Sequence, residues 1–309
     1  MEKFKKIITI VAIIVVIALI GCVGFGIIKN FNNKVQNPIV TMEVEGYGTV
    51  KIELYPDVAP NTVANFIKLA NNGFYNNLTF HRTIPDFMIQ GGDKNGDGTG
   101  TPTLKDLNGD NAESTKYSIK GEFTANDFEN TLRLSKGVIA MARSDYSGMG
   151  LTKEGYNSAG SQFFIMTSDT SNINGQYAGF GKVIEGYDVV EKIANVEVMY
   201  RSSELKEGEE APKDDKGNTI SSDMPKEKPV IKSVSVDTFG IDYGTPETQE
   251  AFDYQSYINK LYGIDTSGVT TKSGVEAENT DSTITTNEVQ DTENVDTESE
   301  VAEQNTDAE

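Results

Sequence analysis

Only one cysteine and one histidine occur among the 309 residues, and these counts limit the chemistry that the chain can perform. A single cysteine, Cys22, cannot form an intrachain disulfide or a multi-cysteine zinc site, and a single histidine, His81, excludes a histidine-rich metal site. Catalysis must therefore come from arginine, carboxylate, amide or hydroxyl groups, or from the shape of an apolar surface. We expect no bound metal and no cofactor.

An acidic stretch at residues 93–98 (DKNGDG) has the spacing with which a calcium-binding EF-hand loop begins. The twelfth position of such a loop needs a glutamate that binds calcium through both oxygens, and this chain has Leu104 there. We therefore predict a glycine-rich loop that does not bind calcium.

Residues 80–93 read FHRTIPDFMIQGGD, and this segment resembles the signature of the cyclophilin family at almost every position. Residues 141–143 (MAR), 161–164 (SQFF) and 180–183 (FGKV) are similar to further family motifs in the same order. The resemblance covers about half of the chain, from residue 40 to 194 with a last stretch near 229–238. It implies a peptidyl-prolyl cis-trans isomerase that acts on proline-containing, unfolded or partly folded polypeptides, and we expect a monomer.

Proline isomerisation needs no nucleophile and breaks no covalent bond. Rotation about the peptide C–N bond is slow, with a barrier of about 18–20 kcal/mol, because resonance gives that bond double-bond character. A catalyst must bind the twisted amide, whose nitrogen lone pair has left the π system, better than either planar isomer. The resemblance implies that Arg82 donates to that lone pair and to the neighbouring carbonyl through its rigid guanidinium. It also implies that Gln90 orients Arg82 and the substrate carbonyl.

The resemblance also implies a set of substrate-binding residues near Arg82. Phe87, Met88 and Phe164 match the apolar pocket that holds the proline ring, and residues 142–143 match the stretch whose backbone pairs with an extended substrate. The complete expected set is Phe87, Met88, Ala142, Arg143, Gln162, Phe164, Ile173 and Tyr177.

The chain departs from the family pattern at the rim of this pocket. Many cyclophilins carry Trp-Leu and later His where this chain has Asn172, Ile173 and Tyr177. Ile173 and Tyr177 can still supply an apolar wall and a polar group, whereas loss of the tryptophan argues against tight cyclosporin binding. The loop at residues 144–160 is longer than the compact family form and would change access for substrate residues before the proline.

Alternation along a strand decides which neighbours can share one site, because successive side chains point to opposite faces. His81 should therefore point away from the face that carries Arg82, and we predict a structural role for it. By the same rule Phe163 should lie in the interior if Phe164 faces the substrate.

Short strands and two amphipathic helices should position these residues. Apolar residues alternate through residues 40–44 and again through 50–54, which predicts a β-hairpin. A helix should begin at Pro60 and end at Gly73, and a second should cover residues 187–194. With the further β-rich runs, the pattern predicts a mainly β protein, a closed antiparallel cyclophilin-like barrel capped by two helices.

The remaining chain divides by composition. A basic start and an apolar run at residues 7–28 can cross a hydrocarbon core of about 30 Å, with the rest of the chain outside the cell. Residues 19–22 also resemble the lipobox of bacterial lipoproteins, which would make Cys22 a lipidation site. An uncleaved anchor and a lipoprotein signal peptide both remain open, and each places the folded part on the extracytoplasmic side of a bacterial membrane.

We assign the domains as residues 1–28, membrane anchor or signal peptide; 29–38, linker; 39–240, isomerase domain with a surface insertion at 202–228; 241–263, helical extension; and 264–309, disordered acidic tail. The tail lacks aromatic residues and cannot bury enough apolar area to fold.

The net charge is −20, and residues 265–309 carry thirteen acidic residues against Lys272 alone. An acidic chain without a basic stripe is repelled by phosphate backbones, which excludes nucleic-acid binding.

Besides the enzyme, two functions remain open: a non-catalytic module that binds proline-containing peptides, and a holdase chaperone at the membrane surface.

Overall fold

The computed structural model describes residues 36–206, 208–213, 217 and 219–264. The segment at residues 1–28, most of the linker and almost the whole of the acidic tail lie outside the described residues. Within the described part, no helix is both long enough and apolar enough to traverse a bilayer. The described residues up to Tyr254 form one compact unit, and a second begins at Gln255.

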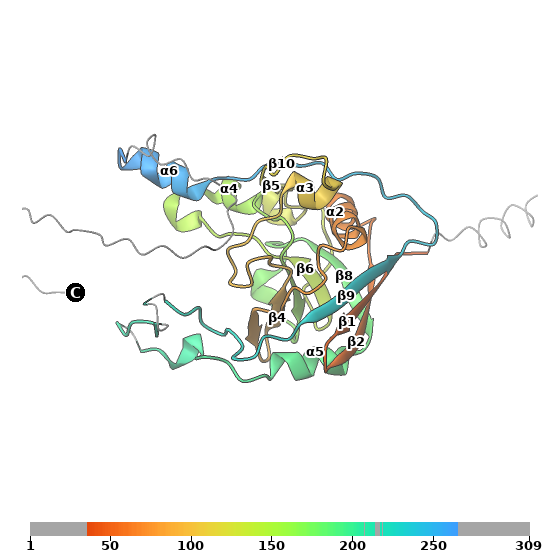
Figure 1. The fold of residues 1–309 in the computed structure, drawn as a ribbon, viewed down its shortest axis with the longest axis horizontal. Helices are drawn as coiled ribbons and strands as arrows, with labels where there is room; N and C mark the ends of the chain where they lie inside the picture. Colours follow the sequence, from red (N-terminus) through yellow and green to blue (C-terminus); the bar gives the residue numbers. More distant parts are fainter. Residues whose placement is uncertain (1–35, 207, 214–216, 218, 265–309) are drawn as a thin grey trace, which may run out of the picture. The chain divides into compact units, whose positions relative to one another are not determined.

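An eight-stranded antiparallel sheet is the framework of the larger unit within the described residues (Figure 1). Its strand order is β3-β4-β7-β6-β8-β2-β1-β9. The strands are β1 (Ile39–Val44), β2 (Gly48–Leu54), β3 (Arg82–Ile84), β4 (Met88–Gly91), β6 (Val138–Met141), β7 (Phe163–Met166), β8 (Gly179–Glu185) and β9 (Ile231–Asp237). The predicted hairpin is confirmed, since β1 and β2 pair in antiparallel register with Val40 opposite Ile52.

Helix α2 (Pro60–Asn71) is the first of the two predicted helices. It begins with a proline, whose missing amide hydrogen is not needed at the first helical position. The next two amides, of Asn61 and Thr62, donate to the Glu122 carboxylate at 3.0 and 2.8 Å. A carboxylate at a helix N-terminus satisfies unpaired amides and matches the helix dipole. Gly73, with a φ of 71°, follows the last turn as predicted.

Helix α5 (Tyr187–Ala194) is the second predicted helix, and it lies beside the β1–β2 turn, away from α2 (Figure 1). Besides these two capping helices, the described residues contain further helical segments, of which α6 (Tyr254–Leu261) falls within the assigned helical extension at residues 241–263. The other helical segments are α3 (Leu104–Asn108), α4 (Thr152–Tyr156) and α6 (Tyr254–Leu261), with 3-10 turns η1 (Thr124–Asn126), η2 (Ser147–Met149), η3 (Ser171–Ile173) and η4 (Ser202–Glu204). Helices of five residues, such as α3 and α4, are too short to show a helical period in the sequence.

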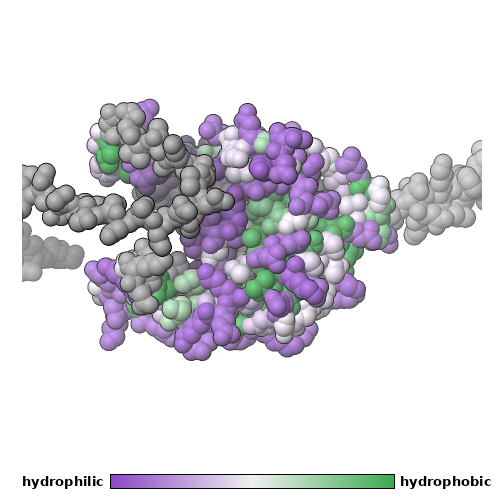
Figure 2. Space-filling model, in the orientation of Figure 1, coloured by the Kyte–Doolittle hydropathy of each residue, from purple (hydrophilic) through white to green (hydrophobic). Residues whose placement is uncertain are grey.

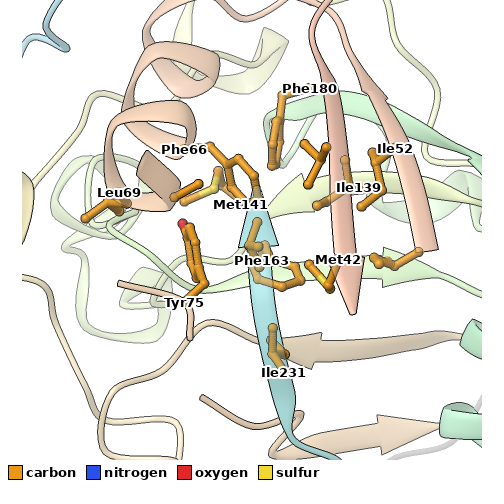
Figure 3. Close-up of a cluster of buried hydrophobic side chains, with 14 of the residues drawn as sticks. Met42, Ile52, Phe66, Leu69, Tyr75, Ile139, Met141, Phe163, Phe180 and Ile231 are labelled. Atoms are coloured by element: carbon orange, nitrogen blue, oxygen red, sulfur yellow. The ribbon is translucent and has the colours of Figure 1, made fainter. Parts of the chain in front are cut away.

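The main core lies between α2 and the inner face of the sheet (Figure 3). Phe66 of α2 is at its centre, with its ring centroid 4.8 Å from that of Tyr75, 5.9 Å from Phe163 and 5.4 Å from Phe180. All four rings are fully buried. The surface visible in Figure 2 is mostly hydrophilic, as expected when the large apolar side chains are inside.

The prediction of a closed barrel was wrong, because within the described residues the sheet curls without a continuous ladder between its end strands β3 and β9. These two edges approach through a bridge between Thr79 and Val230, and the Phe80 amide donates to the Pro229 carbonyl at 2.9 Å. Proline has no amide hydrogen to return the bond, so the ladder cannot continue there. The sheet is therefore a half-barrel.

Two further pairings lie outside the main sheet. β5 (Tyr117–Ser118) pairs with β10 (Gln249–Glu250), a short strand that the sequence did not predict. At the base of the charged insertion, the Met199 amide donates to the Met224 carbonyl at 2.8 Å, and the chain bridges from Val198 to Pro225. The insertion therefore leaves and returns to the domain as a paired stalk.

Candidate active site

One row of paired residues crosses four strands of the sheet. Arg82 of β3 lies opposite Gln90 of β4, Gln90 lies opposite Phe164 of β7, and Phe164 lies opposite Ala140 of β6. Directly paired residues project their side chains from the same face of a sheet. The antiparallel pairing thus places the guanidinium, the amide and the aromatic ring side by side, although they come from distant parts of the chain.

A second apolar cluster lies on this outer face, separate from the main core. We call it the outer cluster. Its buried members are Met88, Leu134, Val138, Ala140, Phe164 and Met166, and the half-buried residues packed on it are Ile84, Phe87, Leu132, Ala142, Ile173 and Tyr177.

The six apolar or aromatic residues of the predicted substrate-binding set all belong to the outer cluster. Phe164 and Tyr177 meet edge to face, with ring centroids 5.4 Å apart. Phe163 points the other way, into the main core, as alternation predicts. The outer cluster therefore forms an apolar surface next to Arg82 and Gln90.

A chain of amide hydrogen bonds orients Gln90. Its Nε2 donates to Oε1 of Gln162 at 2.9 Å, and Nε2 of Gln162 donates to the carbonyls of Gly98 and Gly100 at 2.9 and 3.1 Å. Among the described residues, neither the Gln90 Oε1 atom nor the Arg82 guanidinium has a hydrogen-bond partner. The two groups are therefore available to form hydrogen bonds with each other or with a bound peptide.

Arg143 is held by the surrounding loops. Its Nε donates to the Gln176 carbonyl at 3.0 Å, and its guanidinium carbon lies 4.7 Å from the ring centroid of Tyr177 and 4.8 Å from that of Tyr156. Stacking on two rings makes this side chain a wall beside the outer cluster. The backbone of Ala142 was predicted to pair with an extended substrate. Its amide is already occupied, because it donates to the Gln162 carbonyl at 2.9 Å.

Comparison with known proteins identifies the family of this chain. A family model described as cyclophilin type peptidyl-prolyl cis-trans isomerase/CLD matches residues 39–234. The chain belongs to the cyclophilin family. It is 38% identical over 156 residues to peptidyl-prolyl cis-trans isomerase B of Bacillus subtilis, covering 50% of this chain and 90% of that protein. It is also 40% identical over 166 residues to a peptidyl-prolyl cis-trans isomerase of Acinetobacter baylyi, covering 52% of this chain and 73% of that protein.

A solved cyclophilin from Cryptosporidium parvum, determined in the presence of the dipeptide Ala-Pro, is 26% identical, with a TM-score of 0.46 over 64% of this chain and 98% of that one. The relatives at 38% and 40% identity are themselves named peptidyl-prolyl cis-trans isomerases. This cyclophilin is accordingly a peptidyl-prolyl cis-trans isomerase.

His81 of this cyclophilin directly precedes β3 and is buried, and neither ring nitrogen has a hydrogen-bond partner within the described residues. Burial lowers the pKa of the imidazole, and the opposing charge of Asp93 only partly offsets this effect. His81 is not a member of the outer cluster, and its structural role stays a prediction.

Asp93 has a role that sequence reasoning missed. Its buried carboxylate accepts from the amides of Asn95, Asp97 and Gly98 at 3.0, 2.9 and 2.6 Å. These bonds fold the glycine-rich loop whose carbonyls hold Gln162. A side-chain carbon at Gly100 would lie 1.8 Å from Oδ1 of Asp93, so only glycine fits there. Among the described residues, no group of histidine, cysteine or acidic side chains has a metal-binding arrangement.

Proposed function

We propose that the outer face of the sheet is the catalytic site, and that this cyclophilin isomerises X-Pro bonds there with Arg82 as the electrostatic catalyst. The cross-strand row carries this proposal, because it puts a half-buried guanidinium on the same face as the outer cluster. Neighbouring strands lie about 4.8 Å apart, so the Cα atoms of Arg82 and Phe164 are about 10 Å apart. An extended arginine side chain and a proline ring together fill such a span.

In this mechanism the proline ring rests on Phe164 and Met88, where water is excluded. The residue before the proline turns about the C–N bond while the ring stays in place. As the amide twists, its nitrogen becomes pyramidal and regains a lone pair, and the Arg82 guanidinium donates a hydrogen bond to it. Gln90, oriented by Gln162, holds the guanidinium and the substrate carbonyl. The apolar surroundings strengthen these contacts in the transition state.

Replacement of Arg82 tests this assignment. We expect Arg82→Ala to lower kcat/KM about 100- to 1000-fold, the loss typical of a missing transition-state donor. Arg82→Lys keeps the charge without the rigid fork and should recover only part of the rate. The rates are measured by NMR exchange spectroscopy on an X-Pro peptide. Lys51→Ala, which removes an exposed cation from β2, should match wild type, and an equally active Arg82→Ala would remove Arg82 from the mechanism.

We place this activity outside the cytoplasm, on polypeptides that fold near the membrane surface. The support is the amino-terminal sequence, in which a basic start precedes the apolar run at residues 7–28. Slow X-Pro isomerisation leaves secreted chains exposed to aggregation while they fold, which gives a tethered isomerase a substrate at that surface.

Protease treatment of intact cells tests the location. An extracytoplasmic domain should be cleaved from cells whose envelope has been opened to the protease but whose cytoplasmic membrane is intact. Full protection under these conditions, with a periplasmic or surface marker degraded, would overturn the location. Mass spectrometry of the mature amino terminus decides between the two attachments, since a lipidated Cys22 would be the first residue, whereas an uncleaved anchor keeps residues 1–21.

A further inference from the structure

The strand that carries Arg82 is at the end of the sheet. β3 has only three residues, and within the sheet it pairs on one side alone, with β4. An edge strand presents unpaired backbone groups on its open side. A short strand held from one side is free to shift, and a shift of the strand moves the guanidinium.

The charged insertion supplies the missing partners on that open side. Thr83, the middle residue of β3, donates its amide to the Asp223 carbonyl at 2.9 Å. Nη1 of Arg201 donates to the Thr83 carbonyl. Both backbone polar groups of the residue next to Arg82 are therefore bound by the two ends of the insertion stalk.

These two residues also hold each other. A carboxylate oxygen of Asp223 lies 3.6 Å from Nη1 of Arg201, and the other accepts from the Ser202 hydroxyl at 3.1 Å. Asp223 is 1% exposed and has a φ of 60°, which is uncommon for a residue other than glycine. A buried carboxylate in a left-handed conformation persists only where its surroundings hold it firmly.

We propose that Arg201 and Asp223 are positioning residues that fix Arg82 through the backbone of Thr83. The proposal rests on the role of Arg82 in the proposed function and extends it to the insertion. Transition-state contacts need an accuracy of about 0.5 Å, which a strand bound on both edges can provide. The insertion is thus part of the catalytic framework, although among the described residues no hydrogen bond or ion pair joins Arg201 or Asp223 to the outer cluster.

The experiment separates positioning from simple anchoring by measuring kcat and KM in the full chain. We expect Arg201→Ala and Asp223→Asn to lower kcat about 10- to 100-fold, the cost of small misplacement at a catalytic group. KM should stay within about two-fold, since the outer cluster is intact. Asparagine tolerates the left-handed conformation at this position. Arg201→Lys should recover part of kcat, because its ammonium group can still donate to the Thr83 carbonyl.

The matched control is Lys226→Ala. It breaks the exposed Glu197–Lys226 ion pair in the same stalk, which has no hydrogen bond to β3 among the described residues, and should leave kcat unchanged. Because Arg201→Ala leaves a buried carboxylate unpaired, the double variant Arg201→Ala/Asp223→Asn is included to avoid unfolding. We call the pair of Arg201 and Asp223 bound to the backbone of Thr83 the clamp. Amide hydrogen exchange at Thr83 measures it directly, and we expect lost protection there in Arg201→Ala and Asp223→Asn but not in Lys226→Ala.

A double-mutant cycle with Arg82→Lys distinguishes the two proposals. If the clamp acts through Arg82, Arg201→Ala should cost much less in the Arg82→Lys background than in wild type. An unchanged kcat in Arg201→Ala, with Arg82→Ala inactive, would overturn the clamp and leave the proposed function standing. Additive losses in the cycle would also overturn it. An active Arg82→Ala would instead overturn the proposed function itself.

Discussion

At the scale of single residues, the proposed mechanism depends on how tightly a few polar side chains are oriented. Gln162 donates to two backbone carbonyls of the glycine-rich loop and accepts from Gln90. This amide chain leaves the Oε1 atom of Gln90 without a hydrogen-bond partner among the described residues. The loop, folded around the buried Asp93 carboxylate, therefore contributes to the site without contacting a substrate.

Replacement of Gln162 by leucine tests this relay. We expect Gln162→Leu to lower kcat/KM about ten-fold, because one hydrogen bond contributes about 0.5–1.5 kcal/mol and about 1.4 kcal/mol corresponds to a factor of ten. Peptide isomerisation kinetics provide the measurement. Gln249→Leu is the matched control, since that amide donates to the Asn157 carbonyl outside the outer cluster. Equal rates for both variants would contradict the relay.

The only histidine gives a second prediction at this scale. Burial lowers the pKa of His81 in the folded state, so below a pH of about 6.5 the unfolded chain binds a proton that the folded chain does not. Stability should be full above that pH and fall as the pH decreases, by at most about 1.4 kcal/mol per unit from this group. Urea unfolding from pH 7.5 to 5.5 should show this slope in wild type and a smaller one in His81→Phe. Identical slopes would contradict it.

At the scale of elements, contacts between distant segments hold the helices and edge strands. Glu122 is 4% exposed, and its carboxylate binds two amides and the Thr62 hydroxyl at the start of α2. Helix α2 in turn supplies Phe66 to the main core. The placement of α2 on the sheet therefore depends on an acidic residue in a loop before β6.

Replacement of Glu122 by glutamine should weaken this cap. We expect Glu122→Gln to lower the free energy of unfolding by about 1–3 kcal/mol, because a buried charge-assisted acceptor is replaced by an amide that also carries donors. Urea unfolding followed by circular dichroism is the measurement. The exposed Glu227 is the control, and its change to glutamine should cost less than about 0.5 kcal/mol. Similar values for both variants would rule out the cap.

At the scale of the whole molecule, the larger unit is completed by its last strand. β9 pairs with β1, with Ile39 opposite Asp237, and places Ile231 and Val234 in the main core. The edges of the half-barrel also meet where Val230 bridges to Thr79. The domain cannot bury its core until the chain has passed the insertion and returned.

Two truncations test this dependence on β9. A chain that ends at residue 228 lacks β9 and should not unfold cooperatively, because β1 and the core are left open. A chain that ends at residue 264 keeps every element of the larger unit and should retain the unfolding midpoint and the isomerase activity of the full chain. Thermal circular dichroism measures the unfolding of both truncated chains. A lower midpoint for the longer truncation would mean that the acidic segment stabilises the domain.

Sequence patterns predicted the parts of this molecule that depend on local order. Alternation with period two assigned Phe163 to the core, and the helical period located α2 and α5. The predicted apolar site residues lie together because neighbours on paired strands share a face. The roles of the individual site residues stay predictions until variants are measured.

Tertiary structure alone decided the features made by residues far apart in the chain. Nothing local in the sequence pairs Glu122 with the start of α2, or Arg201 and Asp223 with Thr83, because such contacts leave no period or motif. The open edge between β3 and β9 was missed for the same reason, since it depends on where Pro229 meets Phe80 in space. Residue types and short spacings predicted the family and the chemical groups of the candidate site, whereas folding decided which distant backbone groups hold those residues in place.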